Sequence, residues 1–290
     1  MTRSYAPYPH ADQDTDDGRR RALVALGAAG LGLFVSPPLL AQGRVPAAPG
    51  YDHPMPPLPD DGPRPRVVML VYPKMIMLDL AAPMTMLQVA GFDIDIVGKS
   101  LTPMPTDIGL PVTPAFAFAD YKGQPDVLFV PGGLMGTLAA MDDEETIAFL
   151  VSQGRQVKWV TSVCTGGLLL GAAGLLRGYR ATAHWGVRDL LPRLGAIATN
   201  ERVVVDRNRI TGGGATAGLD FALVLAEKLK GRKVAERAEL ILEYAPAPPF
   251  NVGNPDLAGP ARMKEARARR VYMDAMAAKS VDAARKRLAI

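Results

Sequence analysis

From residue 67 onward the chain alternates short apolar runs with longer amphipathic segments, and this alternation most restricts the folds that it can adopt. Apolar runs of strand length predict strands over 67–72, 92–97, 126–130 and 157–163. The longer amphipathic segments predict helices over 83–90, 137–154, 165–173, 216–230 and 233–244. Two short segments, 202–206 and 209–211, flank a turn and predict a hairpin. We therefore expect an α/β fold whose mostly parallel sheet is covered by helices.

Composition supports one substantial core and argues against a nucleic-acid-binding body. The 290 residues are 48% hydrophobic and 21% charged, as in globular proteins. The last thirty residues contribute +6 to the formal charge of +4, so the remainder has a net charge of −2. Phosphate contacts need basic residues gathered on the folded surface, so we expect no nucleic-acid partner. The single cysteine excludes an intrachain disulfide.

The first 65 residues are predicted to lie outside the fold. A polar start, three consecutive arginines at 19–21 and an apolar run over 22–35 predict a signal peptide over residues 1–41. Paired arginines before a mildly apolar run resemble a twin-arginine signal, which exports folded proteins to the periplasm or beyond; the alternative is an uncleaved membrane anchor. Eight prolines between 42 and 66 predict an extended linker over 42–65. The folded domain would span 66–255, followed by a basic helical extension over 256–290.

The single cysteine, Cys164, lies where an apolar run ends and a Gly-rich helical segment begins. A thiol on such a tight turn points at the first amides of the helix, whose unpaired N–H groups favour a thiolate. The position therefore matches a nucleophile elbow with Cys in place of Ser. The alternative is a buried structural cysteine, which is the commoner role of a lone thiol.

Three polar or Gly-rich features follow the carboxyl ends of separate predicted strands. They are Asp79, the pair Gly132 and Gly133, and Cys164. In open α/β sheets, sites form at the carboxyl ends of the strands. We therefore expect these residues to meet at one edge of the sheet.

Four stretches carry a family resemblance, and they occur in order between residues 66 and 254. They are Leu-Asp-Leu-Ala-Ala-Pro at 78–83, Val-Pro-Gly-Gly at 130–133, Ser-Val-Cys-Thr-Gly at 162–166 and Arg-Ala-Thr-Ala-His-Trp at 180–185. Together they resemble the ThiJ/PfpI superfamily, a branch of the class I glutamine amidotransferase-like fold. The resemblance implies a flavodoxin-like three-layer α/β/α sandwich with a nucleophile elbow, a homodimer, a small-molecule substrate and no cofactor.

Within that superfamily, the chain is most similar to the subgroup that hydrates isonitriles to N-substituted formamides. The stretch at 247–255 also resembles this subgroup. The resemblance implies that Cys164 attacks the isonitrile carbon, and that Asp79 exchanges a proton with the sulfur and then activates water. The alternative for Asp79 is a helix N-cap, although Pro83 favours a cap near Ala82. Sensor halves of some transcription regulators share the same block, but no pair of helix-turn-helix units is recognisable after Tyr244.

Three further residues are candidate parts of the site. The N–H groups of Thr165 and Gly133 would form a donor pair for charge on the substrate, and the Thr165 hydroxyl could bind substrate or water. Thr165 could instead be an ordinary first-turn residue, and Gly133 part of a tight turn. His184 is a candidate for substrate binding near the thiol, or a partly buried histidine beside Trp185.

Two other functions are compatible with the same thiol. One is hydration or hydrolysis of a reactive carbonyl compound. The other is a non-catalytic protein that senses oxidants through Cys164 or binds a small ligand. With one cysteine and one histidine in the predicted domain, we expect no metal site.

Overall fold

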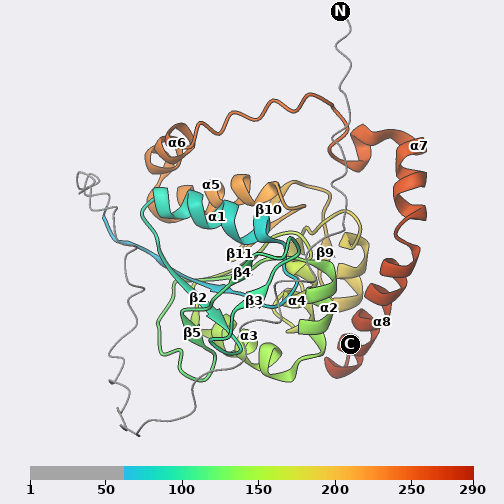
Figure 1. Cartoon of the computed structure of the whole chain (residues 1–290), viewed down its shortest axis with the longest axis horizontal. Helices are drawn as coiled ribbons and strands as arrows, with labels where there is room; N and C mark the ends of the chain where they lie inside the picture. The colour runs from blue at the N-terminus through green and yellow to red at the C-terminus, as the bar shows by residue number, and fades with distance from the viewer. Residues whose placement is uncertain (1–61) are drawn as a thin grey trace, which may run out of the picture. The chain divides into compact units, whose positions relative to one another are not determined.

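The computed structural model describes residues 62–290, and a seven-stranded sheet lies at the centre of this part of the chain (Figure 1). The predicted signal peptide and residues 42–61 of the predicted linker lie outside the described residues. Neighbouring strands are parallel except for the β10–β11 hairpin. In spatial order the strands are β10 (Val203–Asp206), β11 (Arg209–Gly212), β7 (Trp159–Ser162), β6 (Val127–Val130), β1 (Arg66–Leu70), β2 (Asp93–Gly98) and β5 (Phe116–Ala117).

Helices cover both faces of the sheet, as the alternating sequence pattern predicts (Figure 1). One layer holds α1 (Met77–Val89), α5 (Ala217–Lys230) and α6 (Arg232–Ile241). The other holds α2 (Leu134–Asp142), α3 (Glu144–Gln156), α4 (Gly166–Ala172), the 3-10 helix η1 (Arg188–Leu194) and α8 (Val271–Arg287). Short strand pairs β3 (Met104–Pro105) with β4 (Pro111–Val112) and β8 (Arg180–Ala181) with β9 (Ile197–Ala198) lie outside this sheet, and α7 (Pro255–Ala268) precedes α8. The predicted three-layer α/β/α sandwich is confirmed.

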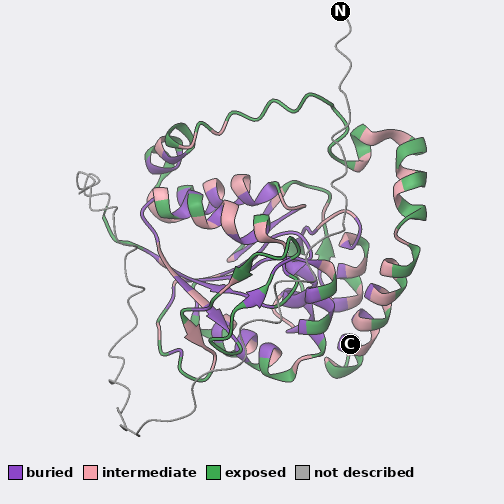
Figure 2. Cartoon of the chain, in the orientation of Figure 1, coloured by how far each residue is buried: buried purple, intermediate pink, exposed green. Residues whose placement is uncertain are grey.

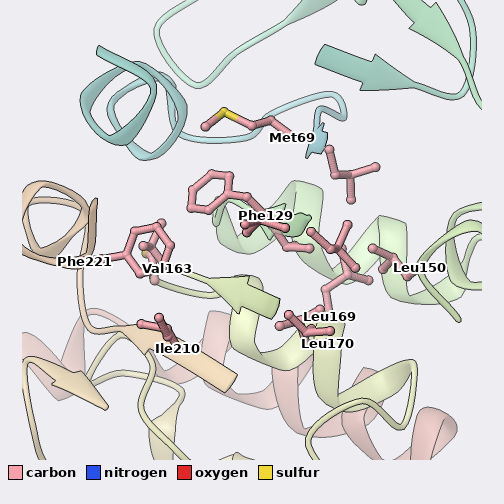
Figure 3. Close-up of a cluster of buried hydrophobic side chains, with 14 of the residues drawn as sticks. Met69, Phe129, Leu150, Val163, Leu169, Leu170, Ile210 and Phe221 are labelled. Carbon is pink, nitrogen blue, oxygen red and sulfur yellow. The ribbon is translucent and has the colours of Figure 1, made fainter. Parts of the chain in front are cut away.

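The core lies on both faces of the sheet, because the central parallel strands are buried on each side (Figure 2). In the layer that contains α5, Phe221 packs against Phe129 of β6, with ring centroids 5.4 Å apart. In the opposite layer Leu150 of α3 and Leu169 and Leu170 of α4 are fully buried (Figure 3). This packing holds β6 and β7 rigidly, and the candidate site follows the ends of these two strands.

Two helix predictions were wrong at their boundaries. The segment 137–154 is two helices and not one, because Asp143 is extended and its side chain accepts the backbone N–H of Thr146, which starts α3. The helix predicted to start at Pro83 begins at Met77, whose N–H donates to Asp107 Oδ1 at 2.8 Å. Pro83 therefore lies inside α1, and Asp79 lies in its first turn.

The basic C-terminal extension is part of the folded unit. Helix α7 has no buried residue, but α8 packs on α2, α4 and η1. Ala277, Val281 and Ala284 of α8 are fully buried. At its C-terminal end, Arg287 donates to the carbonyl of Met141 at 2.7 Å. Small apolar residues at helical spacing thus attach this segment to the helices around the nucleophile elbow.

Removing buried volume from α8 should destabilise the whole domain. We expect Val281→Ala to lower the free energy of unfolding by about 1 to 2 kcal/mol, because it leaves a cavity under α8. The matched control is Val271→Ala in the same helix, whose residue is 69% exposed and which should change stability by less than about 0.5 kcal/mol. Chemical denaturation monitored by circular dichroism measures both, and equal effects would contradict the docking of α8.

Candidate active site

The site forms just past the carboxyl ends of three adjacent strands, β7, β6 and β1. Cys164 follows β7 with a φ of 54°, in the left-handed region that non-glycine residues seldom adopt. Its backbone N–H donates to the carbonyl of Gly213 at 2.6 Å, just past the end of β11, which holds the strained turn in place. The predicted nucleophile elbow is therefore present, and its thiol is 2% exposed.

Asp79 reaches this thiol from the first turn of α1. The residue is fully buried, and its Oδ2 accepts the backbone N–H of Gly132 at 2.8 Å. No side chain caps α1, so the alternative reading of Asp79 as an N-cap is wrong. Oδ1 has no hydrogen-bond partner of good geometry among residues 62–290. A buried carboxylate oxygen without a partner is costly, and here it leaves an acceptor beside the thiol.

The carboxyl and the thiol shift each other's titration. Burial raises the pKa of Asp79 to about 6, and hydrogen bonds from Gly132 and from the Cys164 thiol oppose that rise. Burial and the neighbouring Asp79 charge raise the pKa of Cys164 well above its usual range, while the backbone N–H of Thr165 lowers it. At neutral pH the favoured state is therefore an ionised carboxylate beside a neutral thiol.

Gly132 is what allows these groups to come so close. A Cβ at this position would lie 2.7 Å from Asp79 Oδ2, 2.7 Å from Cys164 Cβ and 2.5 Å from the Thr165 nitrogen. Side chains do not tolerate such distances to backbone atoms. The glycine after β6 therefore lets α1 and the elbow approach from opposite sides.

Gly133 and Thr165 hold each other in an arrangement that differs from the predicted one. The Gly133 N–H donates to Thr165 Oγ1 at 2.8 Å, so it does not face the substrate side as half of a donor pair. That part of the prediction was wrong, because the Gly133 N–H is already donated to the Thr165 hydroxyl within the fold. Gly133 has a φ of 138° and touches the backbone of Met75, which no other residue could do without a clash.

A chain of buried hydroxyls continues from Thr165. Its Oγ1 lies 2.7 Å from Thr137 Oγ1, which lies 3.0 Å from the hydroxyl of Tyr72, and Tyr72 donates to the Pro131 carbonyl at 2.7 Å. The Thr165 hydroxyl is thus engaged on both sides, while its backbone N–H faces the sulfur. Sequence patterns did not identify Tyr72 or Thr137, because the residues around each are typical of an ordinary position in the buried core.

His184 is joined to the elbow through the backbone. Its N–H donates to the Cys164 carbonyl at 3.1 Å, and its Nδ1 accepts the N–H of Gly186 at 3.1 Å. Burial and the charge of Arg270 lower the pKa of His184 to about 4, so the ring is neutral at pH 7. Its ring lies 5.3 Å from that of Trp185. His184 lies beside the site, as predicted, but the contacts that it makes are those of a residue supporting the turn.

A well-formed cavity in the described part of the chain is a separate feature. It has a volume of about 510 Å³ and lies between α2 and the middle of α8, with Tyr72, Met135 and Met276 in its wall. None of Cys164, Asp79, Thr165, Gly133 and His184 lines it.

Among residues 62–290 no three side chains of His, Cys, Asp or Glu are grouped as metal ligands. In the same range no helix has the length and apolarity needed to cross a bilayer.

Neutralising Asp79 should stabilise the protein at neutral pH. The pKa is raised from 3.8 to about 6, so burying the charged form costs nothing below about pH 4 and costs about 2 to 3 kcal/mol above pH 6. Asp79→Asn, whose Oδ1 can still accept the Gly132 N–H, should gain that amount at pH 7, and the gain should vanish by pH 4. Asp120→Asn, at an exposed carboxyl, is the control. Denaturation at both pH values measures the effect, and a gain that persists at pH 4 would exclude this cause.

Comparison with known proteins agrees with this geometry. Residues 65–228 match the DJ-1/PfpI family. The chain is 49% identical over 205 residues to isonitrile hydratase from Pseudomonas putida, a match that covers 70% of this chain and 89% of that protein. It is also 35% identical over 132 residues to the HTH-type transcriptional regulator GbdR of Pseudomonas aeruginosa, covering 44% of this chain and only 34% of the regulator.

A solved structure extends the likeness to the fold. The crystal structure of a ThiJ/PfpI family protein from Pseudomonas syringae superposes with a TM-score of 0.74 at 45% identity, covering 80% of this chain and 98% of that chain. The extent of these matches, together with an elbow cysteine facing a buried carboxylate, favours an enzyme of this group. The chain belongs to the DJ-1/PfpI family.

Proposed function

We propose that the protein is a cysteine-dependent isonitrile hydratase, which adds water to R–N≡C and releases an N-substituted formamide. The observation that carries the proposal is the buried pair of Asp79 and Cys164, in which Asp79 Oδ1 has no partner of good geometry among residues 62–290 and lies beside the thiol. The 49% identity to the Pseudomonas putida isonitrile hydratase supports the choice of substrate. We further propose that the chain acts after export, on the signal-like pattern of its first 41 residues.

In the first half of the reaction the sulfur forms a covalent adduct. The carboxylate of Asp79 takes the thiol proton, and the thiolate attacks the terminal isonitrile carbon. The N–H of Thr165 stabilises the thiolate before attack. The carbon bears the electron pair after attack and takes the proton back from Asp79, which gives the thioimidate R–N=CH–S–Cys164. A carboxyl with a pKa of about 6 is suited to both transfers.

In the second half, water replaces sulfur. The Asp79 carboxylate accepts a proton from water as the oxygen attacks the thioimidate carbon, and then gives that proton to the nitrogen. The tetrahedral adduct collapses as the C–S bond breaks, and the hydroxyl proton returns through Asp79 to the departing sulfur. One water is consumed and R–NH–CHO is released. Oδ1, which has no partner of good geometry among residues 62–290, is the acceptor available for this water.

The oxidant-sensing alternative fits the site less well. A sensor thiol has a lowered pKa and an exposed sulfur. Cys164 is 2% exposed, and its pKa is raised by burial and by Asp79. A buried thiol with a raised pKa stays neutral at rest. Such a thiol fits a nucleophile that is activated only when a bound substrate excludes water and accepts the attack. Hydration of a reactive carbonyl uses the same groups and is separated from isonitrile hydration by substrate profiling.

Replacing the nucleophile should abolish turnover. With an aliphatic isonitrile we expect Cys164→Ser and Cys164→Ala to lower kcat by a factor on the order of 10³ or more, because no other thiol is present. Formamide release, followed by mass spectrometry, is the measurement, and the thermal unfolding midpoint confirms that the variants fold. Glyoxal is the comparison substrate: turnover of glyoxal without turnover of isonitriles would reject the proposed substrate while leaving the nucleophile in place.

The rate should fall in acid. Because the ionised Asp79 carboxylate has to accept the thiol proton, kcat/KM should decrease below about pH 6, tenfold per pH unit, as the Asp79–Cys164 pair takes up a proton. Initial rates between pH 4.5 and 8 give the profile. A rate that stays constant down to pH 5 would contradict the role of Asp79 as base.

A further inference from the structure

Arg270, in the basic C-terminal extension, reaches back to the candidate active site. It is the N-cap residue of α8, and its side chain is only 14% exposed. Its Nη2 lies 2.9 Å from Asp274 Oδ1 and 3.4 Å from the carbonyl oxygen of Gly186. The guanidinium carbon lies 5.3 Å from the centre of the Trp185 ring. Fixing a long arginine side chain in one conformation costs conformational entropy. A role that only placed a charge on the surface would not need this ordering.

Backbone contacts lead from Arg270 to the nucleophile in three steps. Arg270 donates to the Gly186 carbonyl, the Gly186 N–H donates to His184 Nδ1, and the His184 N–H donates to the Cys164 carbonyl. Gly186 leaves room for this contact, because a Cβ there would lie 2.5 Å from the Arg270 guanidinium carbon and would displace the guanidinium. The turn 184–186 is thus clamped between the elbow and the C-terminal extension.

The charge of Arg270 acts at the same place. The charged and titratable groups that act on the Cys164 thiol are Asp79 from α1, Tyr72 after β1 and, from the C-terminal extension, Arg270, whose effect is the weakest of those on the thiol. Asp79 opposes formation of the thiolate, and Arg270 is the cation that favours it. Arg270 is itself partly neutralised by Asp274. Its neighbour Arg267 lies over the same Trp185 ring at 5.2 Å, but its side chain is 46% exposed and pairs with Asp189.

We propose that Arg270 is a positioning residue of the active site, which clamps the turn 184–186 against the elbow and supplies the fixed positive charge that supports the Cys164 thiolate. The inference rests on the proposed role of Cys164 as nucleophile. It gives the extension a function: the docking of α8 on the domain holds one cation against the turn beside the elbow. Arg267, which shares the ring but not the clamp, should have no such effect.

The test is the pH dependence of Cys164 alkylation by iodoacetamide, which reports one thiol because the chain has one cysteine. Arg270→Gln keeps a donor for the Gly186 carbonyl but removes the charge, and should move the midpoint of alkylation up by about 0.5 to 1 pH unit. Arg270→Lys, which keeps the charge, should restore most of that shift. Arg267→Gln is the matched control and should leave the midpoint unchanged.

A second variant keeps the proposal testable if Arg270→Gln does not fold. Asp274→Asn removes the anion that neutralises Arg270 and should move the midpoint in the opposite direction, to lower pH. An unchanged midpoint in folded Arg270→Gln, or an equal shift in Arg267→Gln, would overturn the proposal, as would an upward shift in Asp274→Asn. Because alkylation needs no isonitrile, these outcomes are independent of whether isonitriles are turned over, and failure of the hydratase proposal would show only in formamide release.

Discussion

A buried carboxylate beside a buried thiol is the contact on which the rest of the site depends. Asp79 and Cys164 come from opposite sides, one from the first turn of α1 and the other from the elbow after β7. Burial makes ionising either group unfavourable; the Asp79 charge further opposes formation of the Cys164 thiolate, whereas the hydrogen bond from the thiol favours the Asp79 carboxylate. In the mechanism that we propose, the pair passes one proton between sulfur, carboxylate and a bound substrate.

The surrounding structure is arranged so that this pair can exist. Gly132 leaves room for the two side chains to meet and donates its N–H to Asp79. The hydroxyl chain of Thr165, Thr137 and Tyr72 runs from the Gly133 N–H to the Pro131 carbonyl, and the Thr165 backbone N–H faces the sulfur. The core on both faces of β6 and β7 keeps these groups in register, because close-packed side chains resist small displacements.

Electrostatic support comes from a distant part of the chain. The charge of the extension after residue 255 is typical of a surface helix. In the structure, however, α8 is attached to the domain by buried alanines and a valine. This packing places Arg270 against the turn beside Cys164. Burial of a cation is costly unless it is paired, and Asp274, the Gly186 carbonyl and the Trp185 ring together meet that need. In our proposal, this one side chain links the docking of α8 to the chemistry of the thiol.

The sequence by itself determined the layered α/β architecture, the elbow at Cys164 and the meeting of Asp79, Gly132 and Cys164 at one edge of the sheet. It could do so because strand and helix periodicities are local, and because parallel strands end on the same side. Only the tertiary structure decided where α1 begins. The Met77 N–H donates its hydrogen bond to Asp107, which is thirty positions away in the chain. It also decided that the Gly133 N–H donates to Thr165 and that Arg270 donates to the carbonyl of Gly186, in the turn beside Cys164. These contacts join residues far apart in the chain, and no local pattern encodes which polar group will be nearest once the core has packed.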